Sequence, residues 1–131
     1  MHDEPIKYTV KDLSELGRFI EFMPGPIYIK SVNSVYLYIN QFALKASGLH
    51  KYDSIIGKND YELWPTEFAE QIVRHDQEVF SARKPIINKE ESVLQPNGKT
   101  IYFNVIKIPI FDNYNNLIGI IGNSIDITDR K

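Results

Sequence analysis

The sequence of 131 residues contains no cysteine. This absence excludes disulfides, thiolate metal sites, iron–sulfur clusters, cysteine nucleophiles and any cofactor held through sulfur. No uninterrupted apolar run approaches the roughly 20 residues that a membrane-spanning helix needs. The opening Met1-His2-Asp3-Glu4 lacks the basic start and apolar stretch of a signal peptide. We therefore expect a cytoplasmic protein that does not interact with a membrane.

An excess of charge of either sign is also absent, because 15 Lys and Arg face 17 Asp and Glu and the net charge is −2. Direct nucleic-acid binding is not expected, since phosphate neutralisation needs a basic face. His2, His50 and His75 are too scattered for a local metal motif. Neither a phosphate-cradling glycine loop nor a Gly-x-Ser-x-Gly elbow is present. The chain is therefore predicted to be one globular domain without catalytic activity of its own.

What the sequence does contain is a clear order of periodic segments. An amphipathic helix is expected over 11–23, and Pro24-Gly25-Pro26 ends it. Strands are expected at 27–30, 35–39, 86–95, 100–111 and 117–127, and helical segments at 40–49, 59–64 and 66–83. Asn40, Asn59 and Thr66 are candidate N-caps of these three helical segments. Short polar connections between consecutive strands favour hairpins, so the prediction is an α+β fold with a five-stranded antiparallel sheet.

The last two predicted strands are apolar on both faces. In the first of them, Ile101, Phe103 and Val105 alternate with Tyr102, Ile106 and Ile108. A sheet with one wet face would show polar alternation, so the central helices should cover one face and the 11–23 helix or a second subunit the other. Leaving four or five such side chains in water would cost several kcal/mol at about 25 cal/mol per Å². We therefore predict a homodimer through the N-terminal helix and the outer sheet face.

Two further groups of strand residues have structural interpretations. Tyr36 and Tyr38 are expected to share one face as sheet cover, without a basic groove that would make them a stacking platform for bases. Glu90 and Glu91 fall on a predicted edge strand, where charge discourages unwanted pairing. They are not interpreted as an acid–base pair, because adjacent strand residues point in opposite directions.

The order and spacing of these pieces resemble the PAS sensory fold from about Gly25 to Lys131. The matching segments are Pro26-Ile27-Tyr28-Ile29-Lys30, Tyr36-Leu37-Tyr38-Ile39-Asn40-Gln41-Phe42, Ile56-Gly57-Lys58-Asn59-Asp60, Asp76-Gln77-Glu78-Val79, Lys84-Pro85-Ile86, Asn97-Gly98-Lys99, Gly119, Gly122 and Asp126-Ile127-Thr128-Asp129-Arg130-Lys131. The resemblance implies a PAS domain at 25–128, a capping helix and linker at 1–24, and the start of an output linker at 129–131. It also implies a larger signalling protein, with a histidine kinase or a transcription regulator as the expected host.

The same resemblance implies a ligand pocket in the core. Phe103, Val105, Ile120 and Ser124 would face it, and Ser124 would be the only polar group among them. Trp64 would be a lid or packing anchor, and Ile72 and His75 would approach from the predicted 66–83 helix. A pocket needs a few placed polar groups for specificity, so simple core packing remains an open alternative for this set.

His75 carries the cofactor hypothesis. Haem-binding relatives have their axial histidine on this helix, and the pair His75-Asp76 looks like theirs. The alternative is a partly exposed histidine paired with Asp76 or Glu78. The sequence requires no cofactor, and haem or a non-covalently bound flavin remains open, with no other metal expected.

Asp126 and Thr128 are implied to couple the sheet to an exit helix and thus to a downstream effector, although they could also merely end a strand. Two functions remain open at this point. The domain could sense a small ligand, or it could be a structural dimerisation domain with a filled core.

Overall fold

A five-stranded sheet organises residues 9–130, which are the residues that this computed structural model describes. The strands are β1 (Ile27–Ser31), β2 (Tyr36–Ile39), β3 (Ile86–Leu94), β4 (Thr100–Phe111) and β5 (Leu117–Asp126). They lie in the order β2-β1-β5-β4-β3, and every neighbouring pair is antiparallel. The α+β prediction is confirmed. The expectations that concern Met1-His2-Asp3-Glu4, the rest of residues 1–8 and residue 131 lie outside the described residues.

The helices fall in the expected places with somewhat shorter bounds. They are α1 (Leu13–Ile20), α2 (Gln41–Ser47), α3 (Asp60–Leu63) and α4 (Thr66–Ala82), with 3₁₀ turns η1 (Tyr52–Ser54) and η2 (Thr128–Arg130). Asn40 caps α2, and Asn59 forms a capping box with Glu62 at α3, as predicted. The prediction that Thr66 caps α4 was wrong. The Pro65 carbonyl already accepts from the Phe68 and Ala69 amides, so Pro65 occupies the cap position and Thr66 is the first helical residue.

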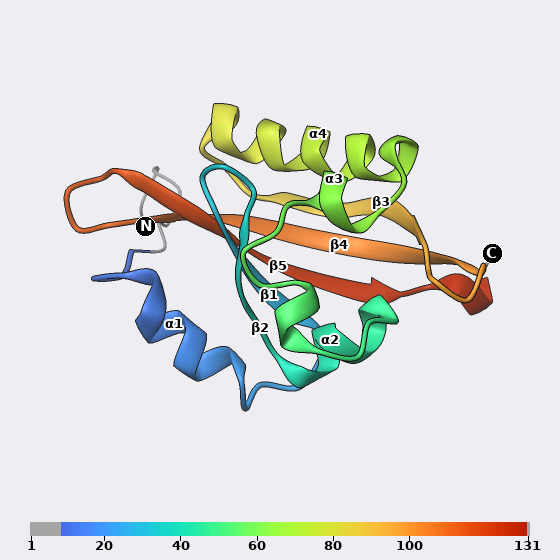
Figure 1. Cartoon of the computed structure of the whole chain (residues 1–131). Helices are drawn as coiled ribbons and strands as arrows, with labels where there is room; N and C mark the ends of the chain where they lie inside the picture. Colours follow the sequence, from blue (N-terminus) through green and yellow to red (C-terminus); the bar gives the residue numbers. More distant parts are fainter. Residues whose placement is uncertain (1–8, 131) are drawn as a thin grey trace.

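Helices cover both sides of the sheet (Figure 1). On one side, Ile20 of α1 packs with Ile27 and Ile29 of β1. On the opposite side, α4 and α3 close over the sheet, and Ile72 and Trp64 pack against buried residues of β3 and β4. The candidate site lies on the side of the sheet that α3 and α4 cover.

The outer face is covered only in part, which qualifies the predicted burial of both faces. The α1 stripe covers β1 and β2, whereas Ile106 and Ile108 on the outer face of β4 are half-buried. Phe19 of α1 and Phe22, which follows this helix, are 71% and 90% exposed. Two large apolar side chains are thus exposed at the helix through which a partner was predicted to bind.

Tyr36 and Tyr38 do not share a face, which corrects the prediction. Tyr36 packs with the inner cluster around Tyr28, whereas Tyr38 packs with the α1 side. The β1–β2 register shifts between Ile29 and Lys30, and this irregularity breaks the alternation of side chains along β2.

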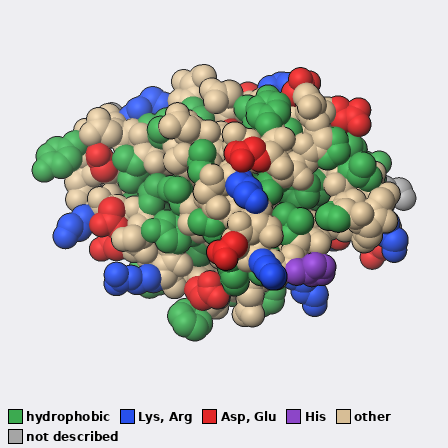
Figure 2. All heavy atoms as spheres, viewed as in Figure 1, with side chains coloured by type: hydrophobic (Ala, Val, Ile, Leu, Met, Phe, Trp, Pro, Cys, Tyr) green, Lys and Arg blue, Asp and Glu red, His purple; other side chains and the backbone are tan. Residues whose placement is uncertain are grey.

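The molecular surface in Figure 2 carries side chains of both signs in alternation, and no basic stripe crosses that face. Within residues 9–130, no helix has the length and apolar character that would let it cross a membrane.

Candidate functional site

A cavity of about 70 Å³ lies between the inner face of the sheet and the helices. Its wall is mostly apolar and aromatic, with the polar side chains of Ser124, Glu91 and the two tyrosines Tyr28 and Tyr36 among the lining residues. Apolar walls with a few placed polar groups are typical of small-molecule sites.

The structure brings four of the predicted site residues to this wall, namely Trp64, Ile72, Phe103 and Ser124. Val105 and Ile120 are fully buried in the same layer but are not among the lining residues. His75 is also outside the wall, on the side of α4 that faces β3.

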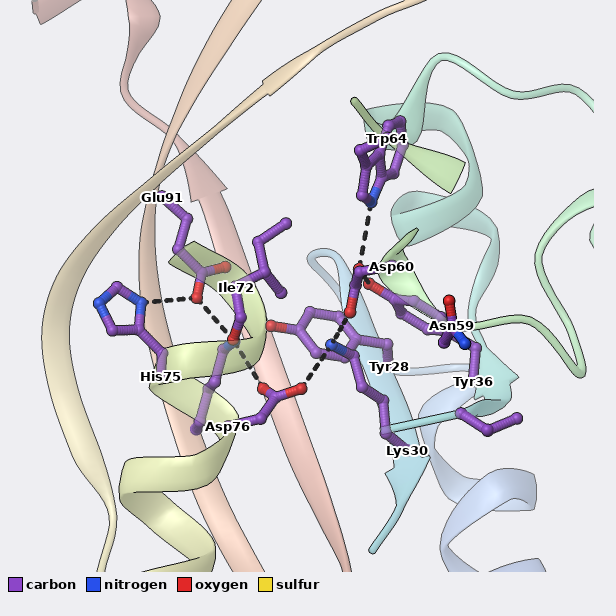
Figure 3. A network of polar contacts seen from close by, with 12 residues as sticks. Tyr28, Lys30, Tyr36, Asn59, Asp60, Trp64, Ile72, His75, Asp76 and Glu91 are labelled. Atoms are coloured by element: carbon purple, nitrogen blue, oxygen red, sulfur yellow. Dashed lines mark hydrogen bonds and ion pairs between the residues drawn. The ribbon is translucent and has the colours of Figure 1, made fainter. Parts of the chain in front are cut away.

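A chain of buried ion pairs runs directly behind the cavity (Figure 3). The Lys30 ammonium on β1 bridges Asp60 of α3 at 2.7 Å and Asp76 of α4 at 2.9 Å. The Lys107 ammonium on β4 bridges Asp76 at 2.7 Å and Glu91 of β3 at 2.6 Å. Four of these five side chains are fully buried, and that of Glu91 is 5% exposed. The network ties α3 and α4 to three strands of the sheet.

Both ends of this network reach the cavity. At one end, Asp60 accepts hydrogen bonds from the Tyr36 hydroxyl at 2.7 Å and from the Trp64 indole N–H at 3.1 Å. These bonds fix the orientation of two aromatic side chains that line the cavity. At the other end, Glu91 lines the cavity itself. A change in the cavity contents would therefore act on the ion pairs directly.

The charges in the network are strongly stabilised. Burial alone would raise the pKa of the Asp76 carboxyl, but the attraction of Lys30 and Lys107 outweighs burial and lowers that pKa to about 2. Burial alone would lower the pKa of both lysines, yet the acidic groups around them raise the pKa of each above its ordinary value. Burial and the adjacent Asp60 carboxylate hold the pKa of Tyr36 well above its usual range. Asp76 and the two lysines thus remain ionised at neutral pH.

A glycine at the centre of the sheet makes room for this arrangement. Gly122 of β5 lies between Tyr28 of β1 and Lys107 of β4 in the strand register. The Tyr28 ring crosses over it so closely that an added Cβ would collide with the ring. The Tyr28 hydroxyl then accepts a hydrogen bond from Ser124 at 3.2 Å, in the cavity wall.

The sequence did not reveal this network. Its members come from five separate elements, and Lys30 is 46 residues from Asp76 in the chain. A signal was nevertheless present, because Lys30 and Lys107 each stand inside an apolar strand at the positions that alternation assigns to the buried face. β3 is an edge strand, as predicted, but the interpretation of Glu91 as a charge that discourages unwanted pairing was wrong, because its side chain is buried and paired with Lys107.

His75 interacts with a residue that the sequence did not suggest. Its Nδ1 donates to Glu91 Oε2 at 2.8 Å, rather than pairing with Asp76 or Glu78, and its side chain is 13% exposed. The ring is therefore turned toward β3 and not into a cavity of only about 70 Å³. This geometry does not fit a haem ligated by His75 or the ring system of a flavin. Within the part of the chain that the structure describes, no cluster of three His, Asp or Glu could hold a metal ion.

The end of β5 is tied back to β4 by the two predicted relay residues. The Tyr102 amide of β4 donates to Thr128 Oγ1 at 3.0 Å, and the Thr128 amide donates to Asp126 Oδ1 at 2.8 Å. In the adjoining ladder, Asp126 pairs with Phe103, whose ring lines the cavity. Asp126, at the end of β5, is thus paired directly with a residue of the cavity wall.

Comparison with known proteins gives a consistent match. A family model described as the PAS fold matches residues 20–131. A diguanylate cyclase of Vibrio cholerae is 30% identical over 118 residues, which are 89% of this chain and 34% of that protein. The chain therefore spans about a third of the length of this curated relative.

Two solved structures are similar over most of the chain. The PAS domain of BvgS from Bordetella pertussis is 28% identical, with a TM-score of 0.74 over 90% of this chain and 88% of that one. The VqmA dimer of Vibrio cholerae, described among LuxR-type receptors, is 26% identical, with a TM-score of 0.72 over 91% of this chain and 52% of that one.

Proposed function

Because this chain belongs to the PAS family of sensory domains in signalling proteins, we propose that it binds a small molecule in its core cavity and passes the event to a downstream effector. The observation that carries the proposal is the cavity, whose aromatic wall is held by a buried ion network. VqmA, one of the similar proteins, has been solved bound to DPO. The domain itself would perform no chemistry.

In this proposal the predicted site residues have different parts. Trp64, Ile72, Phe103 and Ser124 contact the ligand, because they line the cavity. Val105 and Ile120 support the wall from within the core. His75 acts at a distance, since its hydrogen bond helps to hold the Glu91 carboxylate in place. No haem or flavin takes part.

The signal would leave through the last two strands. A ligand that displaces Phe103 would move β4 relative to β5, because Phe103 pairs with Asp126. Thr128 would transmit this shift, because its hydroxyl accepts a hydrogen bond from the Tyr102 amide. The effector attached after residue 131 would be a cyclase, a kinase or a DNA-binding regulator. The two similar signalling proteins, a diguanylate cyclase and the DNA-binding VqmA, support this range.

We further propose a homodimer through α1 and the outer sheet face. The exposed rings of Phe19 and Phe22 provide the apolar surface, and VqmA forms a dimer. Burying each ring would contribute roughly 1.5–3 kcal/mol. In analytical ultracentrifugation, a Phe19→Ser/Phe22→Ser variant should sediment as a monomer at concentrations where the wild type is a dimer. A wild-type monomer at high micromolar concentration would contradict this arrangement.

The experiment on sensing is native mass spectrometry of freshly purified protein. We expect a mass excess that corresponds to a small molecule, and its loss in Ser124→Leu, which fills the cavity. Tyr114→Ser is the matched control, because Tyr114 is 87% exposed on a distant turn. Repeated absence of any bound molecule, together with unchanged effector output from Ser124→Leu in the full-length protein, would contradict sensing.

A structural dimerisation domain is the second candidate function. The observation that favours it is the small size of the cavity, since pockets for drug-sized ligands have roughly 300–1,000 Å³. Under this alternative, filling the cavity would stabilise the domain and leave its output unchanged. The Ser124→Leu comparison therefore separates the two functions.

A further inference from the structure

We propose that the cavity selects a small organic cation, such as an alkylammonium or an amidinium of a few heavy atoms, through the Glu91 carboxylate. This inference rests on the proposed ligand-binding function and specifies the chemical class of the ligand. Three observations carry it: the hydrogen-bonding state of Glu91, the charge of the network, and the aromatic rings around the cavity.

The first observation is that Glu91 makes the polar contacts with His75 and Lys107 through the same oxygen. Oε2 accepts from His75 Nδ1 at 2.8 Å and faces the Lys107 ammonium at 2.6 Å. Oε1 points the other way, toward the Ile72 side chain that lines the cavity (Figure 3). Both oxygens of Asp60 and of Asp76, by contrast, receive donors from the protein. Glu91 therefore offers the acceptor that a ligand donor can reach.

The second observation is an excess of negative charge behind the cavity wall. The network contains the three carboxylates of Asp60, Asp76 and Glu91 but only the two ammonium groups of Lys30 and Lys107. The formal charges of these five side chains therefore sum to −1. A buried charge without a counterion is costly, so a cation in the cavity would be stabilised and an anion excluded.

The third observation is the aromatic wall. The rings of Tyr28, Tyr36, Trp64 and Phe103 line the cavity. Ring faces attract cations, and the network already uses this property, because the Lys30 ammonium lies 4.6 Å from the centre of the Tyr36 ring. A ligand cation at Glu91 would meet the same kind of surface.

The size of the ligand follows from the volume. A cavity of about 150 Å³ holds benzene, whereas this one has about 70 Å³. An occupant of about four heavy atoms is therefore the expected scale. Acetamidinium, acetamide and acetate are planar molecules of this size that differ mainly in charge, and they serve as matched probes.

The test is titration of the ¹⁵N-labelled full chain with each probe at pH 8, observed at the indole N–H of Trp64. This residue is the only tryptophan, so its signal is unambiguous, and it lines the cavity. We expect acetamidinium to shift the signal and to bind at least tenfold more tightly than acetamide, while acetate causes no shift. A charge-assisted hydrogen bond supports a difference of about ten- to hundredfold.

Two variants localise the effect. Glu91→Gln should weaken acetamidinium binding at least tenfold, whereas Glu90→Gln, the same change at the neighbouring exposed position, should leave it unchanged. If Glu91→Gln does not fold, the order of the three probes on the wild type still decides the question. Equal or tighter binding of acetamide or acetate, or no shift with any probe, would overturn the inference.

The outcome is separable from that for sensing. A neutral or anionic molecule found in the purified protein would leave the sensing function in place and refute cation selectivity. Conversely, selective acetamidinium binding in a domain whose output never responds would support the selectivity and refute sensing.

Discussion

Neutralising Asp76 should destabilise the domain more than the loss of any single surface charge. Asp76 holds two buried ammonium groups at once, with each carboxylate oxygen facing one of them. In Asp76→Asn the amide oxygen can still accept from one lysine, but the amide NH₂ group must face the other. Each lysine keeps one remaining carboxylate, Asp60 or Glu91, so the network is weakened but not dismantled.

The magnitude follows from the pKa. The pKa of Asp76 falls from its ordinary 3.8 to about 2, and each tenfold change in proton affinity corresponds to about 1.4 kcal/mol. Protonating this carboxylate therefore costs about 2 kcal/mol more in the folded state than in the unfolded state. Removing one partner of a buried ion pair costs roughly 3–5 kcal/mol. We expect Asp76→Asn to lower the free energy of unfolding by about 2–4 kcal/mol, which is a large part of a typical stability.

Urea denaturation at pH 7, followed by Trp64 fluorescence, measures this loss. Glu78→Gln on the exposed face of the same helix is the control, and it should change the free energy of unfolding by less than about 0.5 kcal/mol. A loss below about 1 kcal/mol in Asp76→Asn would refute the view that the two lysines depend on this carboxylate.

Acid provides an independent measurement of the same quantity. Because the folded-state pKa of Asp76 is depressed, its contribution is fully present above about pH 4 and is lost as the pH falls toward about 2. The wild type should lose about 2 kcal/mol over this interval from Asp76. In Asp76→Asn this part of the acid dependence should be missing, and an unchanged acid profile would contradict the assignment.

Three further predictions concern other parts of the fold. Gly119→Ala should lower the free energy of unfolding by roughly 1–3 kcal/mol in urea titrations, because the new Cβ would lie 2.5 Å from the Lys30 carbonyl oxygen; a neutral effect would contradict the close strand approach. Asn40→Ala should lower the free energy of unfolding by more than about 2 kcal/mol in thermal denaturation, since this buried side-chain amide bonds to five backbone groups. A loss of only about 1 kcal/mol, as for an ordinary helix cap, would contradict this role. Alkaline ultraviolet titration should detect no tyrosinate from Tyr36 until the protein unfolds, because the pKa of Tyr36 is raised, and the Tyr36→Phe variant identifies its contribution. Ionisation of Tyr36 in the folded protein would contradict its burial.

The fold could be predicted from the sequence because its signals are local. The run of β-branched and aromatic residues identified β4 with its bounds, and Gly98 in the Asn97-Gly98 turn before it has a positive φ. Asn40 and Asn59 marked two helix starts through bonds to amides only three residues away. Tyr36 and Tyr38 were wrongly assigned to one common face, because a register shift depends on the partner strand, which periodicity does not describe.

The candidate site could be predicted only in part. Phe103 and Ser124 were placed at the cavity by resemblance, and alternation supports their common face. The ion network was missed because charge complementarity between distant elements leaves no spacing pattern. Lys107 and Glu91 become partners only through the β3–β4 hairpin and the rotation of their side chains into one layer. Short-range patterns therefore define the scaffold, and the tertiary structure alone assembles its charges.

The position of β5 has a consequence for the synthesis of this protein. The last strand of the sheet along the chain inserts between β1 and β4, so the earliest strand finds its second neighbour only after residue 126 has been made. Until then the edges of β1 and β4 that will face β5 are unpaired, and unpaired edges promote aggregation. The domain should consequently fold late on the ribosome, and a fragment that stops at residue 111 should fail to accumulate in cells.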